Sequence, residues 1–203
     1  MITAKEENYG KKLLLHSCCA PCSSYVLTYL SSFFDITVFY YNPNITDLSE
    51  YSHRVSEQKR LIDALNSDGY VPEWSLRQSE RIKIGFIEGE HDTEEFLRVS
   101  KGLEEVPEGG SRCEQCFMLR LNKTGQLADE MGFDYFTTTL TISPLKNACL
   151  INAVGEKVSN DIAPIWIPSD FKKKNGYAHS IELSAKYDLY RQNYCGCDFS
   201  KRD

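Results

Sequence analysis

Seven of the eight cysteines in this chain fall into three short motifs, and these motifs are its clearest chemical signal. They are CCAPC (Cys18, Cys19 and Cys22), CEQC (Cys113 and Cys116) and CGC (Cys195 and Cys197). When a CxxC motif opens a helix, its two sulfurs can converge on one metal, and the helix N-terminus favours the thiolate form. We therefore expect metal binding or thiol redox chemistry.

The spacing leaves the identity of the metal open. Two CxxC pairs commonly hold zinc between four sulfurs. The adjacent residues Cys18 and Cys19 depart from that pattern, because neighbouring side chains in extended backbone point in opposite directions and so suit different irons of a cluster better than one ion. A [4Fe–4S] cluster takes about four thiolates, and Cys18, Cys19, Cys113 and Cys116 supply that number. A thioredoxin-like CAPC dithiol is the third possibility, but it gives CEQC no role.

Other polar side chains near these motifs have ordinary structural explanations. Cys22 can be the residue that begins a helix. Cys149 lies in the apolar run ACLINAV, where a cysteine is typically a small buried hydrophobe, and we place it outside the site. His16 is expected to satisfy a backbone group. Thr137–Thr139 and Ser143 offer hydroxyls, although threonine is also a good strand former.

The composition indicates a globular protein. With 203 residues, 41% of them hydrophobic and 26% charged, the chain can bury one substantial core, and we expect a single domain over residues 1–203 with its core in about 13–200. No apolar run approaches a membrane span, and the stretch MITAKEENYGKK is polar, so we expect a cytoplasmic protein without a membrane partner. A reducing compartment disfavours a structural disulfide framework. The net charge of -6 argues against sequence-blind nucleic-acid binding but permits a local basic patch.

The cysteine motifs belong to a chain in which strand-like and helix-like patterns alternate. Strands are expected over residues 11–17, 35–42, 133–143 and 161–168. Helices are expected over residues 22–34, 51–69, 92–106, 113–132, 147–158 and 179–192, with Cys22 or Ser23 capping the first and Gly69 ending the second. This order predicts an α/β fold with a mostly parallel sheet covered by helices on both faces.

Ligands of such sheets bind beyond the carboxyl ends of the strands, where the strand order changes direction. The CCAPC loop follows the apolar run LLL, and the loop SPLK (Ser143–Lys146) follows the strand FTTTLTI. We therefore expect these two loops to face each other across one crevice.

Four long motifs, in order, resemble the QueH-type epoxyqueuosine reductases. They are HSCCAPC, PEGGSRCEQCFMLRL, GFDYFTTTLTISPLK and DFKKKNGYAHSIELSAKYDLYRQNYCGCDFS, and the resemblance extends from about Leu13 to Ser200. It implies a Rossmann-like fold similar to the adenine nucleotide alpha hydrolase group. It also implies a cytoplasmic oxidoreductase for the last step of tRNA queuosine biosynthesis, in which an epoxide oxygen is removed reductively from epoxyqueuosine at the wobble position of the anticodon.

The same resemblance implies the roles of the cysteines. By position, Cys18, Cys19, Cys113 and Cys116 match the ligands of a [4Fe–4S] cluster, with a mononuclear iron beside it that Cys22 is a candidate to bind. Cys195 and Cys197 match a redox-active disulfide. The electron donor stays unidentified. Candidate tRNA contacts are residues that can reach phosphates or stack on a base, namely Lys172, Lys173, Lys174, Arg191 and Tyr177.

Two other functions use the same cysteines. A zinc-stabilised RNA-binding or tRNA-thiolation protein of similar fold would use them for structure or sulfur transfer. A thiol redox sensor would exchange electrons between CAPC and CGC. The adjacent pair Cys18 and Cys19 and the order of the four motifs favour the reductase.

Overall fold

Strands and helices alternate in the computed structural model, which describes residues 10–68 and 83–201. The strands are β1 (Lys11–His16), β2 (Phe34–Tyr40), β3 (Gly85–Glu88), β4 (Tyr135–Thr138) and β5 (Ile165–Trp166). The helices are α1 (Ala20–Leu30), α2 (Leu48–Asp68), α3 (Thr93–Ser100), α4 (Ser111–Glu130), α5 (Ala148–Ser159) and α6 (Gly176–Lys186), with 3₁₀ turns η2 (Thr139–Ile142) and η3 (Asp198–Ser200).

The strands form one parallel sheet in the order β3-β2-β1-β4-β5. β1 is central, and its Leu14 is paired with Thr37 of β2 and Phe136 of β4. Parallel strands need crossover connections that place helices on the sheet faces. The predicted α/β, Rossmann-like class is therefore confirmed.

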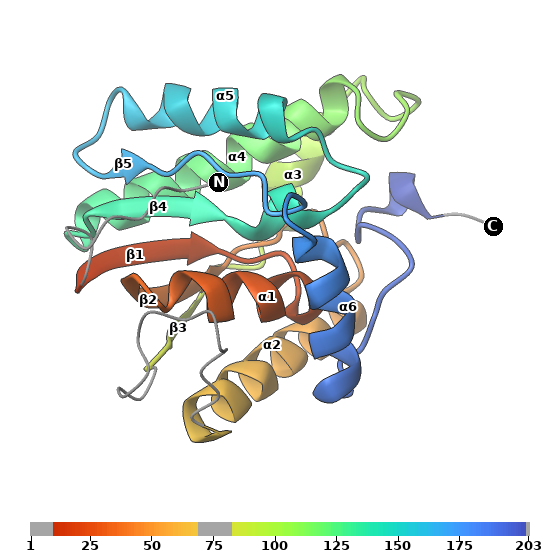
Figure 1. Cartoon of the computed structure of the whole chain (residues 1–203). Helices are drawn as coiled ribbons and strands as arrows, with labels where there is room; N and C mark the ends of the chain where they lie inside the picture. The colour runs from red at the N-terminus through yellow and green to blue at the C-terminus, as the bar shows by residue number, and fades with distance from the viewer. Residues whose placement is uncertain (1–9, 69–82, 202–203) are drawn as a thin grey trace.

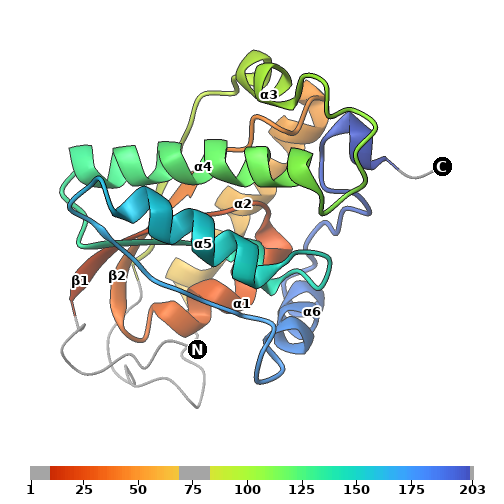
Figure 2. The same ribbon diagram turned by 90° about the horizontal axis from the view of Figure 1, so that it is seen from above.

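The side chains of β1 alternate between two cores. Leu13 and Leu15 pack with α1 and α2, whereas Leu14 packs with α4 and α5. Figure 1 shows α4 and α5 on one side of the sheet and α1 and α2 on the other, and α6 packs against α1. Seen from above in Figure 2, α4 and α5 run side by side across the sheet. Both faces are thus covered, and the carboxyl edge of the sheet is left to carry a site.

The strand order places a change of direction beside β1. The chain builds β1, β2 and β3 outward in one direction and then adds β4 on the opposite side of β1. The loops after β1 and β4 leave the same edge of the sheet, where the arrows of both strands point toward the C-terminal segment in Figure 1. The crevice predicted between the CCAPC loop and Ser143–Lys146 lies at this edge.

Several element boundaries differ from the sequence prediction. The first helix begins at Ala20, so neither Cys22 nor Ser23 is its cap, and Cys19 is the N-cap residue. β4 ends at Thr138, because the chain turns into η2 where a longer strand was expected. β3 was not predicted, since its four residues at the sheet edge are only half-buried and carry little pattern. Gly69, expected to end the second helix, lies outside the described residues.

Left-handed residues end two helices earlier than predicted. α3 ends at Ser100, close to Gly102, which has a φ of 79°. α6 ends at Lys186, and Asp188 has a φ of 47°. Because the chain leaves the helix there, residues 188–197 run past α2 toward the carboxyl edge of the sheet. In the described part of the chain, every helix is too short or too polar to cross a membrane.

Candidate active site

The turn between β1 and α1 gathers three thiols. Cys18 lies at a bend after the strand, Cys19 is the N-cap residue of α1, and Cys22 lies in its first turn. The sulfurs of Cys18 and Cys19 are 3.8 Å apart, and all three sulfurs lie within 4.8 Å of one another. The expectation that Cys18 and Cys19 point apart is therefore wrong, because the chain bends at Cys18. Cys22 belongs to the group and also lies in the first turn of α1, so the structure fits both interpretations of it.

These three thiols share their charge unequally. Hydrogen bonds from Cys19 and Cys22 hold the pKa of Cys18 well below its ordinary value, and the hydroxyl of Thr139 also donates to its sulfur at 3.4 Å. The same hydrogen bonding raises the pKa of Cys19 to about 12 and raises the pKa of Cys22. The thiolate form is therefore favoured most strongly at Cys18, and each thiol that binds a metal must release its proton.

The second cysteine pair begins α4, as predicted. Cys113 lies in the first turn of the helix, where its sulfur accepts a hydrogen bond from the backbone N–H of Gly109 at 3.2 Å. Cys116 is buried in an apolar cluster with Phe96 and Cys197, and burial raises its pKa to about 11. This pair lies outside the group formed by Cys18, Cys19 and Cys22, which is the only such metal-binding group within residues 10–68 and 83–201.

The CGC motif lies beside the second pair. Both of its cysteines are free thiols, and Cys197 is buried. Gly196 has a φ of 112°, and a Cβ there would lie 2.7 Å from Cγ1 of Ile45. The backbone N–H of Thr46 donates to the Gly196 carbonyl at 3.3 Å, which fixes the turn against the β2–α2 loop. A glycine is therefore required between the two cysteines.

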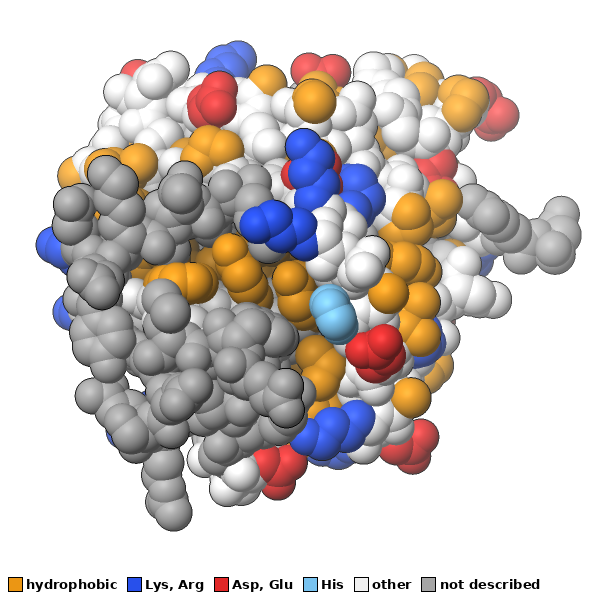
Figure 3. Space-filling view, in the orientation of Figure 1, with side chains coloured by type: hydrophobic (Ala, Val, Ile, Leu, Met, Phe, Trp, Pro, Cys, Tyr) orange, Lys and Arg blue, Asp and Glu red, His pale blue; other side chains and the backbone are white. Residues whose placement is uncertain are grey.

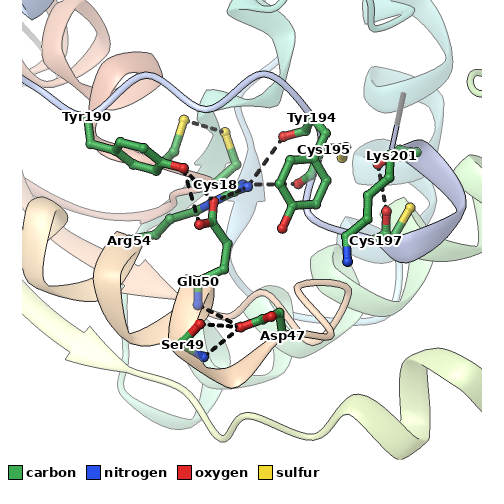
Figure 4. A network of polar contacts seen from close by, with 12 residues as sticks. Cys18, Asp47, Ser49, Glu50, Arg54, Tyr190, Tyr194, Cys195, Cys197 and Lys201 are labelled. Atoms are coloured by element: carbon green, nitrogen blue, oxygen red, sulfur yellow. Dashed lines mark hydrogen bonds and ion pairs between the residues drawn. The ribbon is translucent and has the colours of Figure 1, made fainter. Parts of the chain in front are cut away.

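A buried arginine of α2 holds this C-terminal segment in place (Figure 4). Arg54 donates to the carbonyls of Cys195 at 3.2 Å and Tyr194 at 3.4 Å, and it pairs with Glu50 at 2.7 Å. The hydroxyl of Tyr190 donates to the same carboxylate at 3.2 Å. Sequence analysis missed Arg54. The only signal was a charged residue next to Val55 in the buried stripe of α2, four positions after an acidic residue.

A pocket of about 180 Å³ lies where these segments meet. The β1–α1 turn contributes Cys18 and Cys22, the loop after β4 contributes residues 143–146, and the C-terminal segment contributes residues 191–195. The predicted crevice between the CCAPC and SPLK loops is confirmed. Basic side chains from four segments line it, namely Arg54, Arg120, Lys146 and Arg191. A positively charged pocket in a chain of net charge -6 favours an anionic ligand or anionic thiolates.

Lys146 connects the pocket to the CGC motif. Its ammonium donates to the Cys195 sulfur at 3.5 Å and lies 4.0 Å from the Glu108 carboxylate. The negative charge of a Cys195 thiolate raises the pKa of Lys146, which therefore holds its proton while Cys195 is ionised. Sequence analysis placed Lys146 in a candidate loop but gave it no role.

Comparison with known proteins places this chain in a family. The family model described as epoxyqueuosine reductase QueH matches residues 13–203. The chain belongs to this family. An epoxyqueuosine reductase QueH of Streptococcus pyogenes is 44% identical over 98% of this chain and 73% of its own length. Those of Acinetobacter baylyi and Thermotoga maritima are 36% and 33% identical, over 100% and 93% of this chain and 86% and 89% of their own lengths.

Other residues singled out from the sequence of this QueH-family member have mixed outcomes. His16 is fully buried, with Nε2 3.1 Å from the Tyr41 carbonyl, so it satisfies a backbone group as expected. Burial lowers its pKa to about 3, which keeps it neutral. Thr137 and Thr138 are buried in the fold, and only Thr139 contacts a site cysteine. Cys149, expected to be buried, is exposed on α5.

The candidate tRNA contacts divide into two kinds. The Lys172 ammonium donates to the carbonyls of Thr141 at 2.9 Å and Lys146 at 3.3 Å, so it joins two backbone segments. Lys173, Lys174, Tyr177 and Arg191 are exposed, and Tyr177 and Arg191 line the pocket. Figure 3 shows Lys and Arg side chains gathered over the segment that leads into α6.

Proposed function

We propose that this chain removes the epoxide oxygen from epoxyqueuosine at the wobble position of a tRNA anticodon and leaves queuosine. The reaction consumes two electrons and two protons and releases the oxygen as water. A tRNA substrate would place the enzyme in the cytoplasm. The observation that carries the proposal is the convergence of Cys18, Cys22 and Cys195 on one positively charged pocket at the edge of a parallel sheet.

The donor set fits an iron–sulfur centre. Thiols are the ligands that clusters prefer, and apolar side chains shield Cys116 from water. We assign Cys18, Cys19, Cys113 and Cys116 to a [4Fe–4S] cluster and Cys22 to an adjacent iron. When bound, these groups would supply electrons one at a time and a Lewis acid for the departing oxygen.

We assign the proton delivery to Lys146, whose ammonium lies in the pocket. While Cys195 is a thiolate, its charge holds the proton on Lys146. When Cys195 and Cys197 give up two electrons and form a disulfide, that charge disappears, and Lys146 can release its proton more readily. Electron release and proton delivery are thereby coupled.

A change of Lys146 to glutamine is therefore expected to lower kcat by about 10²-fold or more, within the range for loss of a general acid, with metal content unchanged. Lys146→Arg keeps the positive charge but cannot release a proton at neutral pH, so it should be equally slow. Single-turnover rates with chemically reduced protein measure both effects. Restoration of the rate by arginine would show that only the charge of Lys146 matters.

Exposed basic side chains beside the pocket are our candidates for binding the tRNA backbone. Lys173 and Lys174 precede α6, and Arg191 lies at the pocket mouth with Tyr177, which can stack on an exposed base. Lys172 is excluded from this set by its two backbone contacts.

Replacing Lys173 and Lys174 with glutamine should weaken tRNA binding. It should also reduce the slope of log Kd against log salt concentration, by about 0.7 for each single-strand phosphate contact that is lost. The exposed Lys123 of α4 offers a matched control, because Lys123→Gln removes the same charge from another surface. An equal change of slope in both proteins would assign the effect to net charge and not to direct phosphate binding.

The proposed activity is tested by incubating anaerobically purified protein, a chemical reductant and tRNA that carries epoxyqueuosine. Digestion and mass analysis should find the nucleoside lacking one oxygen atom. The protein should be brown and contain several irons per chain. A colourless zinc protein that leaves the nucleoside unchanged would exclude the reductase and favour a structural role for the cysteines.

A further inference from the structure

Arg120 is a fully buried cation beneath the cysteine motifs. It lies one turn after Cys116 in α4, and 1% of its surface is exposed. Its guanidinium contacts three groups: Nε lies 3.2 Å from Nε2 of His16, Nη2 donates to the side-chain oxygen of Asn42, and Nη1 lies 3.9 Å from the Cys116 sulfur. Arg120 also lines the pocket together with Cys18 and Cys195.

Unlike Arg54, Arg120 has no carboxylate partner among the residues that the structure describes. Arg54 is also buried, and it pairs with Glu50 at 2.7 Å. A third buried arginine, Arg112, donates to the backbone carbonyls of residues 103, 104 and 106. The groups beside Arg120 are a neutral imidazole, whose Nε2 can accept from Arg120 only when it does not donate to the Tyr41 carbonyl, a neutral amide and a thiol. The thiol is the only one of them that can become an anion.

An unpaired buried charge is expensive, and arginine cannot escape the cost by releasing its proton. Removing one partner of a buried ion pair is strongly destabilising for this reason. Three cysteines, one from each motif, lie where the Arg120 charge favours their anionic forms: Cys116 is 3.9 Å away, and Cys18 and Cys195 line the same pocket. The fold therefore keeps a permanent positive charge where these motifs meet.

We propose that Arg120 is the fixed counter-cation of the metal centre, which favours the more negative, reduced state of the centre and so raises its reduction potential. This inference rests on the proposed function, because it assumes a redox-active metal group. Arg120 is a positioning residue here, since it acts through the thiolates and touches no substrate. The competing explanation is a neutral structural role, in which Arg120 only joins β1 to the segment after β2 through His16 and Asn42.

Three variants separate charge from shape. Arg120→Lys keeps the positive charge and loses the planar guanidinium group. Arg120→Gln loses the charge and keeps a hydrogen-bonding side chain. Asn42→Asp keeps the guanidinium and supplies it with a carboxylate of nearly the same shape, so the charge offered to the thiolates is neutralised. Lys123→Gln, on the exposed face of the same helix, is the control for a lost charge.

The test measures the midpoint potential of the reconstituted centre by spectroscopic titration and metal per chain by chemical analysis. We expect Arg120→Gln and Asn42→Asp to decrease the ratio of reduced to oxidised centre at least tenfold at a fixed potential, a shift of about 59 mV for one electron. In Arg120→Lys and Lys123→Gln the ratio of reduced to oxidised centre should change by no more than about twofold, which by the same relation is about a third of that shift. An unchanged potential in Asn42→Asp, or equal shifts in Arg120→Lys and Arg120→Gln, would overturn the inference.

Loss of the metal is also informative. If Arg120→Gln retains no metal while Arg120→Lys does, the requirement for charge is supported. If both lose it and Asn42→Asp keeps the wild-type potential, the role is structural and the inference fails.

Failure of the proposed function has a different signature. A wild-type protein that reduces no epoxide, but whose potential depends on the charge at Arg120, would exclude the activity and leave the inference intact. If wild type binds only a redox-inert ion, there is no midpoint potential to measure, and the test instead measures how much of that ion each protein retains against a chelator. Arg120→Gln and Asn42→Asp should retain less of the ion than Arg120→Lys. Equal retention by all three would overturn the inference.

Discussion

Replacing any one of Cys18, Cys19, Cys113 or Cys116 with serine is expected to remove most of the iron and to reduce the rate of deoxygenation by more than about 100-fold. Loss of a residue that only hydrogen-bonds to a metal ligand already lowers metal affinity or activity by about 10–100-fold, and loss of a ligand should cost more. A serine hydroxyl stays protonated where a thiol becomes a thiolate ligand. The measurements are iron per chain after anaerobic purification and conversion of epoxyqueuosine in tRNA.

Cys113→Ser is the most informative of these variants. Cys18, Cys19 and Cys22 lie close enough to bind one ion without help, whereas Cys113 belongs to α4. A protein that keeps full iron and activity after this change would confine the metal to the β1–α1 turn. The control is Cys149→Ser, because Cys149 is exposed on α5 outside the pocket, and its replacement should change neither measurement.

The position of the site could be predicted from sequence because it depends on a general property of parallel sheets. Successive strands end at the same edge, so the residues that follow β1 and β4 had to meet, and Cys18 does contact Thr139. The position of the CEQC pair at the start of α4 followed equally from a local pattern, a glycine-containing loop leading into a helical stripe.

Contacts between distant segments could not be predicted in this way. Arg54 and Cys195 are 141 positions apart in the chain, and their contact depends on α6 ending at Lys186 so that the segment after it can pass over α2. Arg120 is a buried residue of α4, and the apolar stripe of that helix gives no indication that this arginine contacts Cys116 and shares a pocket with Cys18 and Cys195. The contacts of such residues depend on how distant segments pack together. In the sequence, the only sign of them is a charged residue within an apolar stripe.

Errors about individual cysteines had a local cause. The divergence expected of Cys18 and Cys19 assumed extended backbone, but the chain bends there so that α1 can begin at Ala20. The burial expected of Cys149 assumed that an apolar run is buried on all sides, whereas α5 turns that residue to solvent. Both assumptions failed at the start of a helix, where backbone direction changes within two residues.

Cys197→Ser is expected to keep its metal and to lose turnover with a physiological electron donor. In the structure, Cys195 lies at the pocket beside Lys146, while Cys197 is buried in one apolar cluster with Cys116. A reversible disulfide between these residues would therefore connect the pocket to a proposed cluster ligand. Exchange needs both sulfurs, because a donor thiolate that attacks one sulfur of the disulfide forms a mixed disulfide and releases the other cysteine as a thiolate, and that thiolate must attack the mixed disulfide to close the ring again.

The reductant identifies the defect. A strong chemical reductant that reaches the metal directly should restore part of the rate in Cys197→Ser, and it should restore none in Cys113→Ser, which lacks the metal. Iron analysis and rates with both reductants therefore form one experiment. If Cys197→Ser loses its iron, Cys197 belongs to the metal site, and if it turns over normally with every reductant, the CGC motif carries no electrons to the site. If the CGC motif relays electrons, Cys197→Ser should keep its full iron content and recover part of its rate with the strong chemical reductant. Only a relay makes the buried Cys197 thiol necessary for electron supply but dispensable for metal binding.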